Sequence, residues 1–261
     1  MSTIIPKNDT VNRPKFPPDE GISSIQLRDI EFDNDKKHLR IYRQKFCFLV
    51  IPCGVVHHHE KRIVGGNETT PYAMPWTVAL LYPNGNTLCS GVLISSWNIL
   101  TAAHCTNQLG FEQPFSIVIG EHYLRNATNG SMHFPSSVIP HPDYVDGSYS
   151  GDDIAIVTLS EQIQLGSRAV HVCLPSPNIN DTFLSGKSLT VSGWGRTSTS
   201  ASTSDVLRSV EIPYVNITTC QSIEINSWTN ITENMICTGD LQNGGVSTCH
   251  GDSGGEFYNN K

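Results

Sequence analysis

Three short segments, far apart in the chain, carry a histidine, an aspartate and a serine. They are Thr101-Ala-Ala-His104-Cys105, Asp153-Ile-Ala-Ile156 and Gly251-Asp-Ser253-Gly-Gly255. A hydroxyl is a weak nucleophile until a base removes its proton, and a neutral imidazole can do this near neutral pH. A carboxylate beside the imidazole fixes its tautomer and stabilises its cation. These residue types therefore predict nucleophilic acyl chemistry, with a candidate for each of the three roles.

Each candidate also has an ordinary structural explanation. His104 alone is typical of a packed histidine, Asp153 could cap a turn while Asp152 competes for its role, and Ser253 lies among turn-forming glycines. The pattern Gly251-x-Ser253-x-Gly255 also fits the nucleophile elbow of α/β-hydrolases, which place the acid and the histidine after the serine. Only 8 of the 261 residues follow Ser253, and none of them is histidine. The order His, Asp, Ser excludes that alternative.

The sequence around these segments predicts an all-β domain that must bring them together. From residue 63 onward, short apolar runs bounded by Gly, Pro, Asn or Ser have the spacing of strands in a sandwich or barrel. No long stretch has the 3.6-residue period of a helix. The runs cover 78–82, 91–94, 115–119, 154–157 and 188–192. The Ser/Thr-rich stretch 197–204 predicts an exposed loop.

Composition excludes some classes of protein. A net charge of −7 and a pI near 5.8 argue against nucleic-acid binding, which usually requires a basic face. The 8 cysteines could form disulfides, bind metal or stay reduced, but no CxxC pair is present, which argues against a zinc cluster. Together with spread-out cysteines, several N-x-[ST] sequons favour an oxidising secretory route. The candidate glycosylation sites are Asn67, Asn126, Asn129, Asn180, Asn216 and Asn230.

Residues 1–62 differ from the rest and predict a flexible leader. They hold scattered prolines and a charged stretch over 28–37. The residues after Met1 do not fit a signal peptide, and the apolar run 46–56 is too short to span a membrane. We interpret that run as a propeptide segment rather than a displaced signal region or an anchor remnant. The tract 57–60, His-His-His-Glu, could bind metal, but we interpret it as a solvated stretch that keeps the next bond accessible.

Over residues 63–261 these motifs resemble the trypsin/chymotrypsin family of serine endopeptidases. The resemblance rests on motifs that occur in the family's order: Arg62-Ile63-Val-Gly-Gly66, Pro75-Trp76, Gly91–Ile94, Thr101–Cys105, Gly193-Trp-Gly195 and Gly251–Gly255. It implies an all-β fold of two packed six-stranded antiparallel β-barrels. It also implies a division into a leader or propeptide, 1–62, and a peptidase domain, 63–261, that uses no cofactor.

The resemblance implies a role for each candidate residue. His104 would act as general base and then general acid, Asp153 would orient it, and Ser253 would attack the scissile carbonyl. The backbone N–H groups of Gly251 and Ser253 would form the oxyanion hole.

The resemblance also implies an activation step and a substrate preference. Cleavage after Arg62 would free the Ile63 amine to form a buried ion pair with Asp252. Ser247, six residues before the nucleophile, would form an uncharged floor of the primary pocket, so we expect apolar residues before the cut. Some family members bind calcium through glutamates in the loop that corresponds to 121–132. After Glu121 this loop offers Asn, Thr and Ser instead, so we expect no metal.

Eight cysteines allow 105 disulfide connectivities in principle. The resemblance implies Cys89–Cys105, which would lock the histidine loop, with Cys220–Cys237 and Cys53–Cys173. The last pair would keep the leader attached after cleavage. Cys47 and Cys249 have no evident partner in the sequence.

The sequence departs from the family after Gly255, where the family usually has proline and further strands. Here Glu256-Phe-Tyr-Asn-Asn-Lys261 follows. We therefore expect a fragment, a partial gene product or a truncated isoform whose second barrel is incomplete. Two functions follow: a secreted monomeric endopeptidase, or a non-catalytic homologue that acts as an extracellular binding or regulatory module. The expected partners are protein or peptide substrates, an activating trypsin-like protease, and serpins or other protein inhibitors, with no nucleic acid.

Overall fold

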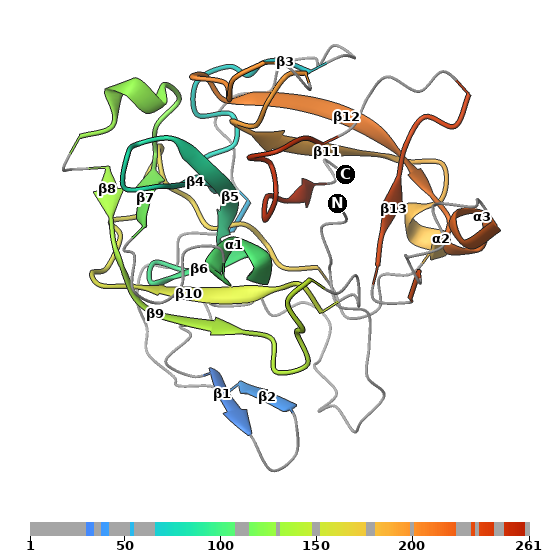
Figure 1. The fold of residues 1–261 in the computed structure, drawn as a ribbon, viewed down its shortest axis with the longest axis horizontal. Helices are drawn as coiled ribbons and strands as arrows, with labels where there is room; N and C mark the ends of the chain where they lie inside the picture. The colour runs from blue at the N-terminus through green and yellow to red at the C-terminus, as the bar shows by residue number, and fades with distance from the viewer. Residues whose placement is uncertain are drawn as a thin grey trace.

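The computed structural model describes residues 30–33, 38–41, 53–54, 66–107, 115–128, 131–147, 152–175, 181–198, 201–222, 231–232, 235–242 and 248–258. Several predicted site residues lie outside these ranges: Cys47, Arg62, Ile63, Asn129, Asn180, Asn230 and Ser247. Two antiparallel sheets, one toward each side of the molecule, contain most of the strands of the described chain (Figure 1). A separate antiparallel pair joins β1 (Ile30–Asp33) to β2 (His38–Ile41).

The first sheet closes on itself. Its strand order is β8-β7-β4-β5-β6-β10-β9, and all its pairs are antiparallel. Only Phe134 separates β8 from β9, so the two are halves of one long strand that pairs with β7 at one end and β10 at the other. The result is the expected first barrel. Its strands are β4 (Thr77–Leu81), β5 (Thr87–Leu93), β6 (Asn98–Thr101), β7 (Ser116–Ile119), β8 (Met132–His133), β9 (Pro135–Pro140) and β10 (Ala155–Leu159).

The second sheet has the order β13-β12-β11-β14, with β3 added on β12. It does not close among the residues that the structure describes. Its strands are β3 (Asn67–Glu68), β11 (Ser188–Gly193), β12 (Arg208–Val215), β13 (Cys237–Thr238) and β14 (Phe257–Tyr258). The prediction of an all-β fold built from two antiparallel barrels is confirmed.

Helices are few and short in the part of the chain that the structure describes. They are α1 (Ala103–Asn107), the 3-10 turn η2 (Leu124–Asn126), α2 (Asp181–Leu184) and α3 (Ile217–Ser222). Within the described ranges, no helix has the length and apolar character needed to cross a bilayer.

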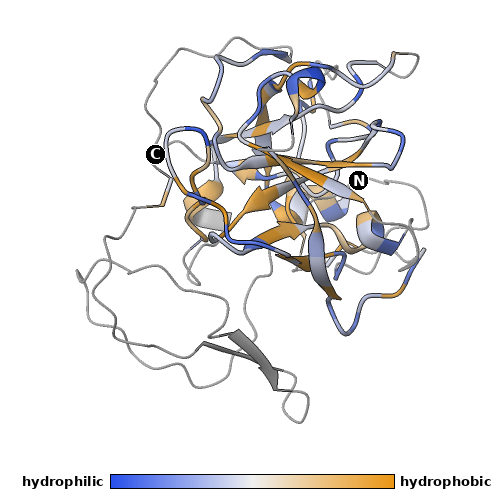
Figure 2. Cartoon of the chain, turned by 90° about the vertical axis from the view of Figure 1, so that its left-hand side faces the viewer, coloured by the Kyte–Doolittle hydropathy of each residue, from blue (hydrophilic) through white to orange (hydrophobic). Residues whose placement is uncertain are grey.

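Strand residues follow the burial pattern that their sequence predicts. In β10, Ala155, Val157 and Leu159 are buried while the two residues between them are only partly buried, as the two-residue period of a strand requires. All five residues of β4 are buried, because this strand has the barrel core on one face and the second sheet on the other. Apolar colour accordingly gathers on the strands and polar colour on the connections (Figure 2).

The seam between the two sheets holds a buried polar cluster. Thr77 Oγ1 of β4 and Ser192 Oγ of β11 lie 2.8 Å apart. Glu256 Oε1 lies 3.0 Å from Thr77 Oγ1, 2.6 Å from Ser192 Oγ and 3.1 Å from the indole nitrogen of Trp76. A carboxyl group therefore lies where the two barrels meet.

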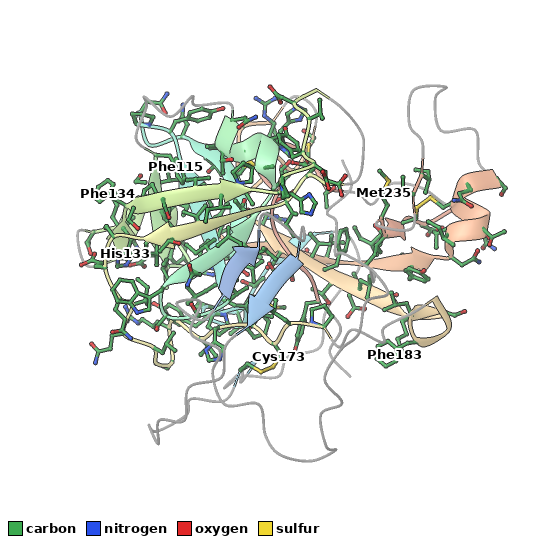
Figure 3. The ribbon with its side chains drawn as sticks, turned by 90° about the horizontal axis from the view of Figure 1, so that it is seen from below. Phe115, His133, Phe134, Cys173, Phe183 and Met235 are labelled. Carbon is green, nitrogen blue, oxygen red and sulfur yellow. A yellow bond between two sulfur atoms is a disulfide. The ribbon has the colours of Figure 1, made fainter. Side chains whose placement is uncertain are left out.

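Three disulfides join Cys53–Cys173, Cys89–Cys105 and Cys220–Cys237, the pairs that the resemblance implies. Cys249 is the one free cysteine of the described chain. In Figure 3, Phe115 and Phe134 mark the first barrel, and Phe183 and Met235 mark the second sheet at the other end of the domain. Cys173 lies along the lower edge of that view.

Candidate active site

Two paired strands bring His104 and Asp153 together. Thr101, the last residue of β6, lies opposite Ala155, the first residue of β10. His104 follows β6 in α1, and Asp153 precedes β10, so their side chains meet at the same end of the barrel. This register explains how two residues 49 positions apart in the sequence come into direct contact.

Asp153 holds His104 at two points. Its Oδ2 lies 2.6 Å from Nδ1 of the imidazole, and its Oδ1 accepts a hydrogen bond of 2.8 Å from the His104 backbone N–H. Asp152, the competing candidate, accepts a bond from Ile154 N–H through its backbone carbonyl. A ring whose Nδ1–H faces a carboxylate keeps Nε2 as its basic nitrogen. The histidine and aspartate side chains are 22% and 23% exposed, so the pair remains open to solvent on one side.

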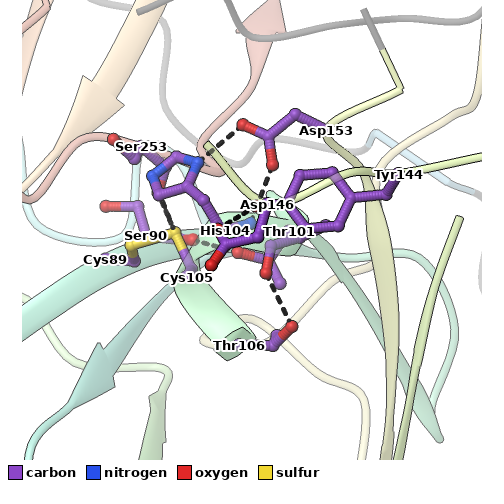
Figure 4. A network of polar contacts seen from close by, with 11 residues as sticks. Cys89, Ser90, Thr101, His104, Cys105, Thr106, Tyr144, Asp146, Asp153 and Ser253 are labelled. Carbon is purple, nitrogen blue, oxygen red and sulfur yellow. Dashed lines mark hydrogen bonds and ion pairs between the residues drawn. A yellow bond between two sulfur atoms is a disulfide. The ribbon is translucent and has the colours of Figure 1, made fainter. Parts of the chain in front are cut away.

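Ser253 lies on the other side of the imidazole from Asp153 (Figure 4). Its carbonyl oxygen is 3.7 Å from Cys105 Sγ, and the same sulfur is 3.6 Å from His104 Nε2. The backbone carbonyl of Ser253 and the basic nitrogen of His104 therefore both lie close to the same sulfur of the Cys89–Cys105 disulfide. The structure brings the three residues that the sequence predicts into one cluster.

Glycines allow the serine loop to pack against the first barrel. Gly254 has φ +83°, and a Cβ there would lie 2.2 Å from Thr101 Oγ1 and 2.4 Å from Ser90 O. Gly251 has φ +98°, and its Cβ would lie 2.9 Å from the Cα of Gly195. Both positions need a residue without a side chain. The loop is thus wedged between β5 and β6 on one side and the turn after β11 on the other.

Ser90 is a supporting residue that the sequence analysis missed. Its N–H donates to Ser253 O at 2.8 Å, and its hydroxyl donates to Gly251 O at 2.9 Å. Thr101 Oγ1 in turn donates to Ser90 O at 2.8 Å. Ser90 thus links the loop of the nucleophile to β6, which precedes the histidine. Its position after Cys89 gives no local sign of this role, because the two residues of the serine loop that it contacts lie more than 160 residues away.

Asp252 faces away from this cluster and into the second barrel. Its Oδ1 accepts from Gly195 N–H at 2.8 Å, and its Oδ2 accepts from Cys249 N–H at 3.0 Å. A Cβ on Gly193 or Gly195 would lie 2.4 Å from this carboxylate, which explains the two glycines that flank Trp194. Burial raises the pKa of Asp252, and the two backbone bonds only partly oppose this. No basic side chain of the described residues pairs with it.

Among the described residues, one group of side chains has the spacing of a metal site, but its chemistry does not fit. Ligand atoms of Cys89, His104 and Cys105 lie within 4.8 Å of one another. The two sulfurs form a disulfide, so they have no thiolate to offer a metal.

Three of the predicted glycosylation sites can be located, and all three are exposed: Asn67, Asn126 and Asn216. Asn67 lies on β3 and Asn126 ends η2. Asn216 precedes α3, where its Oδ1 accepts from Thr219 N–H at 2.8 Å and caps the helix.

Comparison with known proteins gives consistent matches. The family model described as trypsin matches residues 63–261. Alkaline trypsin B of Manduca sexta is 34% identical over 209 residues, covering 77% of this chain and 77% of that protein. Mannan-binding lectin serine protease 1 of Mus musculus is 33% identical over 220 residues, covering 78% of this chain but only 30% of that protein. The solved structure of mouse neuropsin, titled as a serine protease, matches with a TM-score of 0.61 and 29% identity over 75% of this chain and 82% of its own.

Proposed function

Because the chain belongs to the trypsin family of serine endopeptidases, we propose that it hydrolyses peptide bonds in proteins through Ser253, His104 and Asp153. The observation that carries this proposal is the two-point contact of Asp153 with the ring and backbone of His104. That contact leaves Nε2 as the base, on the side of the ring where Ser253 lies.

In the proposed reaction, His104 Nε2 takes the proton of Ser253 Oγ as the oxygen attacks the scissile carbonyl carbon. The carbonyl oxygen gains the negative charge, and we assign its stabilisation to the N–H groups of Gly251 and Ser253. The imidazolium then donates its proton to the leaving amine, and the C–N bond breaks to leave an acyl-serine. Water, deprotonated by the same histidine, attacks that ester and releases the acid product and the free serine.

We propose that cleavage after Arg62 activates the protein. The new Ile63 amine would pair with Asp252, whose buried carboxyl has no basic side chain beside it among the described residues. A cation at this position would offset the desolvation of the Asp252 carboxylate, which is what raises its pKa. The serine loop contains Asp252, so the ion pair would fix the N–H groups of the oxyanion hole.

We assign the primary substrate preference to Ser247, which lies outside the described residues. A serine floor cannot neutralise a buried cation, so we expect Phe, Tyr or Leu before the cut rather than Arg. Peptide substrates that differ only in this residue measure the preference directly. Faster cleavage after Arg would contradict the assignment.

We propose the remaining features together. Residues 1–62 form the propeptide and 63–261 the peptidase domain, which stay joined through Cys53–Cys173 after cleavage. The protein is a secreted monomer, glycosylated at the exposed sequons, activated by a trypsin-like protease and inhibited by serpins or other protein inhibitors. The disulfides fit an oxidising compartment.

Labelling with a fluorophosphonate tests the proposal, because the probe reacts only with an activated serine. We expect labelling of the chain cleaved at Arg62, none in Ser253→Ala, and strong loss in His104→Ala. Ser222→Ala, a change at the end of α3, is the matched control and should label like the parent. Absence of labelling in folded, cleaved protein would favour the non-catalytic module instead.

A further inference from the structure

An exposed arginine and an exposed histidine border the serine loop, and the proposed reaction uses neither side chain. His250 directly precedes Gly251 in the sequence, and the Arg196 N–H donates to His250 O at 2.9 Å. Gly251 also packs on the residue before Arg196, because a Cβ on Gly251 would lie 2.9 Å from the Cα of Gly195. The turn after β11 and the serine loop therefore lie directly against each other, and both side chains are exposed where they meet.

Arg196 lies close to the point where the carbonyl of a substrate would bind. The hydrogen bond to His250 O keeps the Cα of Arg196 at most about 7 Å from the backbone nitrogen of Gly251. That nitrogen carries one of the two N–H groups that we assign to the oxyanion hole. An extended peptide advances about 3.3 Å per residue. Substrate residues within about three positions of the scissile bond therefore pass within reach of the Arg196 side chain.

Arg196 differs from the other basic side chains because it has no partner. From residue 66 onward, the described ranges hold five lysine and arginine residues. Four of them have a contact: Arg125 with Asp205, Arg168 with Tyr72, Lys187 with Phe183 and Arg208 with Gly66 O. The Arg196 guanidinium has no ion pair, side-chain hydrogen bond or ring contact with a described residue.

The chemistry of the two side chains suits a carboxylate. A guanidinium presents a planar fork of N–H donors that matches the two oxygens of a carboxyl group. The ring of His250 adds a further N–H, which a neutral imidazole also carries. An acidic residue of a substrate could therefore accept from both side chains at the surface beside the serine loop.

The other side of the catalytic cluster carries the opposite charge. The connection between β9 and β10, residues 141–154, ends beside the triad with Asp153 and contains no lysine or arginine. It holds three further aspartates: Asp143, Asp146 and Asp152. Ser253 lies on the far side of the His104 ring from Asp153 (Figure 4). A substrate carboxylate would be repelled at the aspartate side of the site and attracted at the side of Arg196.

We propose that Arg196 and His250 are specificity residues that favour substrates with an acidic side chain within three residues of the scissile bond, on one side of it only. This inference rests on the proteolytic function proposed above, and it names the class of protein substrate that the site prefers. Exposed ion pairs are individually weak, so we expect a preference of about threefold for glutamate over glutamine.

Peptide cleavage by the full chain, cut after Arg62, tests the inference. The peptides share one sequence, with the residue that is cleaved fastest directly before the cut. They differ in a single Glu, Gln or Lys, placed in turn at each other position within three residues of the cut. At positions on one side we expect glutamate to raise kcat/KM about threefold over glutamine. Salt at 1 M should remove this difference, because the Debye length then falls to about 3 Å.

Variants of the two residues separate a charge preference from a loss of structure. Arg196→Gln should cleave the glutamine peptides like the parent and lose the preference for glutamate. Arg196→Glu should reverse the preference, so that the lysine peptides are cleaved fastest. His250→Ala should lower the preference, because it removes one donor. Arg168→Gln, at an exposed arginine that stacks on Tyr72, is the matched control and should keep the parental preference.

The results also separate this inference from the function on which it rests. Equal rates for the glutamate, glutamine and lysine peptides at every position would overturn the inference and leave the proteolytic function intact. A glutamate preference that survives in Arg196→Gln and Arg196→Glu would also overturn it, because another group would then bind the acid. If folded, cleaved protein cuts no peptide and does not react with the fluorophosphonate, the proposed function fails, and the inference fails with it.

Discussion

Glu256 presents a buried acid in the seam between the barrels, and we predict that it makes stability depend on pH. The residue is 9% exposed, and its Oε2 has no hydrogen-bond partner among the residues that the structure describes. Oε1, Thr77 Oγ1 and Ser192 Oγ lie 2.6–3.0 Å from one another. Both hydroxyls can donate to Oε1, but the other carboxyl oxygen is buried without a partner, so burial disfavours the charged form relative to the neutral acid.

Burial raises the pKa of Glu256, and the bonds from Ser192, Thr77 and Trp76 oppose this only in part. The native state therefore keeps a proton that the unfolded state releases above its ordinary pKa of 4.5. The stabilisation is fully present below pH 4.5 and is lost as pH rises through the native pKa. Between those two pH values the free energy of unfolding should fall by up to about 1.4 kcal/mol per pH unit.

Urea unfolding of the parent and of Glu256→Gln, measured at several pH values from 4 to 8, tests this prediction. Glutamine keeps the shape and cannot ionise, so the difference between the two proteins should move in favour of the variant as pH rises. Asp143→Asn, at an exposed acid between β9 and β10, serves as the control and should follow the parent. Parallel curves for the parent and Glu256→Gln would show that the carboxyl does not titrate between the native and unfolded states.

Three further predictions concern the site. Asp153→Asn should lower kcat/KM on the order of 10⁴-fold, whereas Asp152→Asn should change it only a few-fold; the reverse ranking would mean that the wrong aspartate was assigned. Gly254→Ala should lower the melting temperature strongly, because its Cβ meets Thr101 and Ser90, whereas Gly239→Ala meets nothing within 4 Å and should not. Ser90→Ala removes a bond worth about 1 kcal/mol, so fluorophosphonate labelling should slow about fivefold; an unchanged rate would show that Ser90 does not support the loop.

Strands that read as continuous apolar runs could be predicted, and the others could not. The runs 78–82 and 154–157 correspond closely to β4 and β10, which are buried in the first barrel. The sequence analysis missed β12, Arg-Ser-Val-Glu-Ile-Pro-Tyr-Val, because most of its residues are only partly buried and it mixes polar with apolar side chains. It also missed β9, which begins and ends with proline and exposes half of its residues. Local hydrophobicity finds a strand where apolar residues follow one another in the sequence, and it misses strands that mix polar with apolar side chains.

The residues of the candidate site also fall into two groups, those that could be predicted from the sequence and those that could not. His104, Asp153 and Ser253 could be found because their chemistry requires those residue types in recognisable motifs. Ser90 could not, because a serine that bonds to a distant backbone has the same local appearance as any strand serine. The His122–Glu68 contact likewise depends on two segments that meet only in the folded chain. Residues that react leave a pattern in the sequence, while residues that hold them leave one only in the tertiary structure.

The supports of the serine loop come from both barrels, so its geometry depends on how the barrels pack together. Ser90 of the first barrel holds the carbonyls of Gly251 and Ser253, and Gly195 of the second sheet holds the carboxylate of Asp252. Gly255 N–H closes a turn on Asp252 O at 3.0 Å, and the next residue is Glu256. A charge on Glu256 would destabilise the packing between the two barrels at the point where the serine loop ends. If its ionisation loosens the seam, labelling of Ser253 should slow over the same pH range in which stability falls, and Glu256→Gln should remove both effects together.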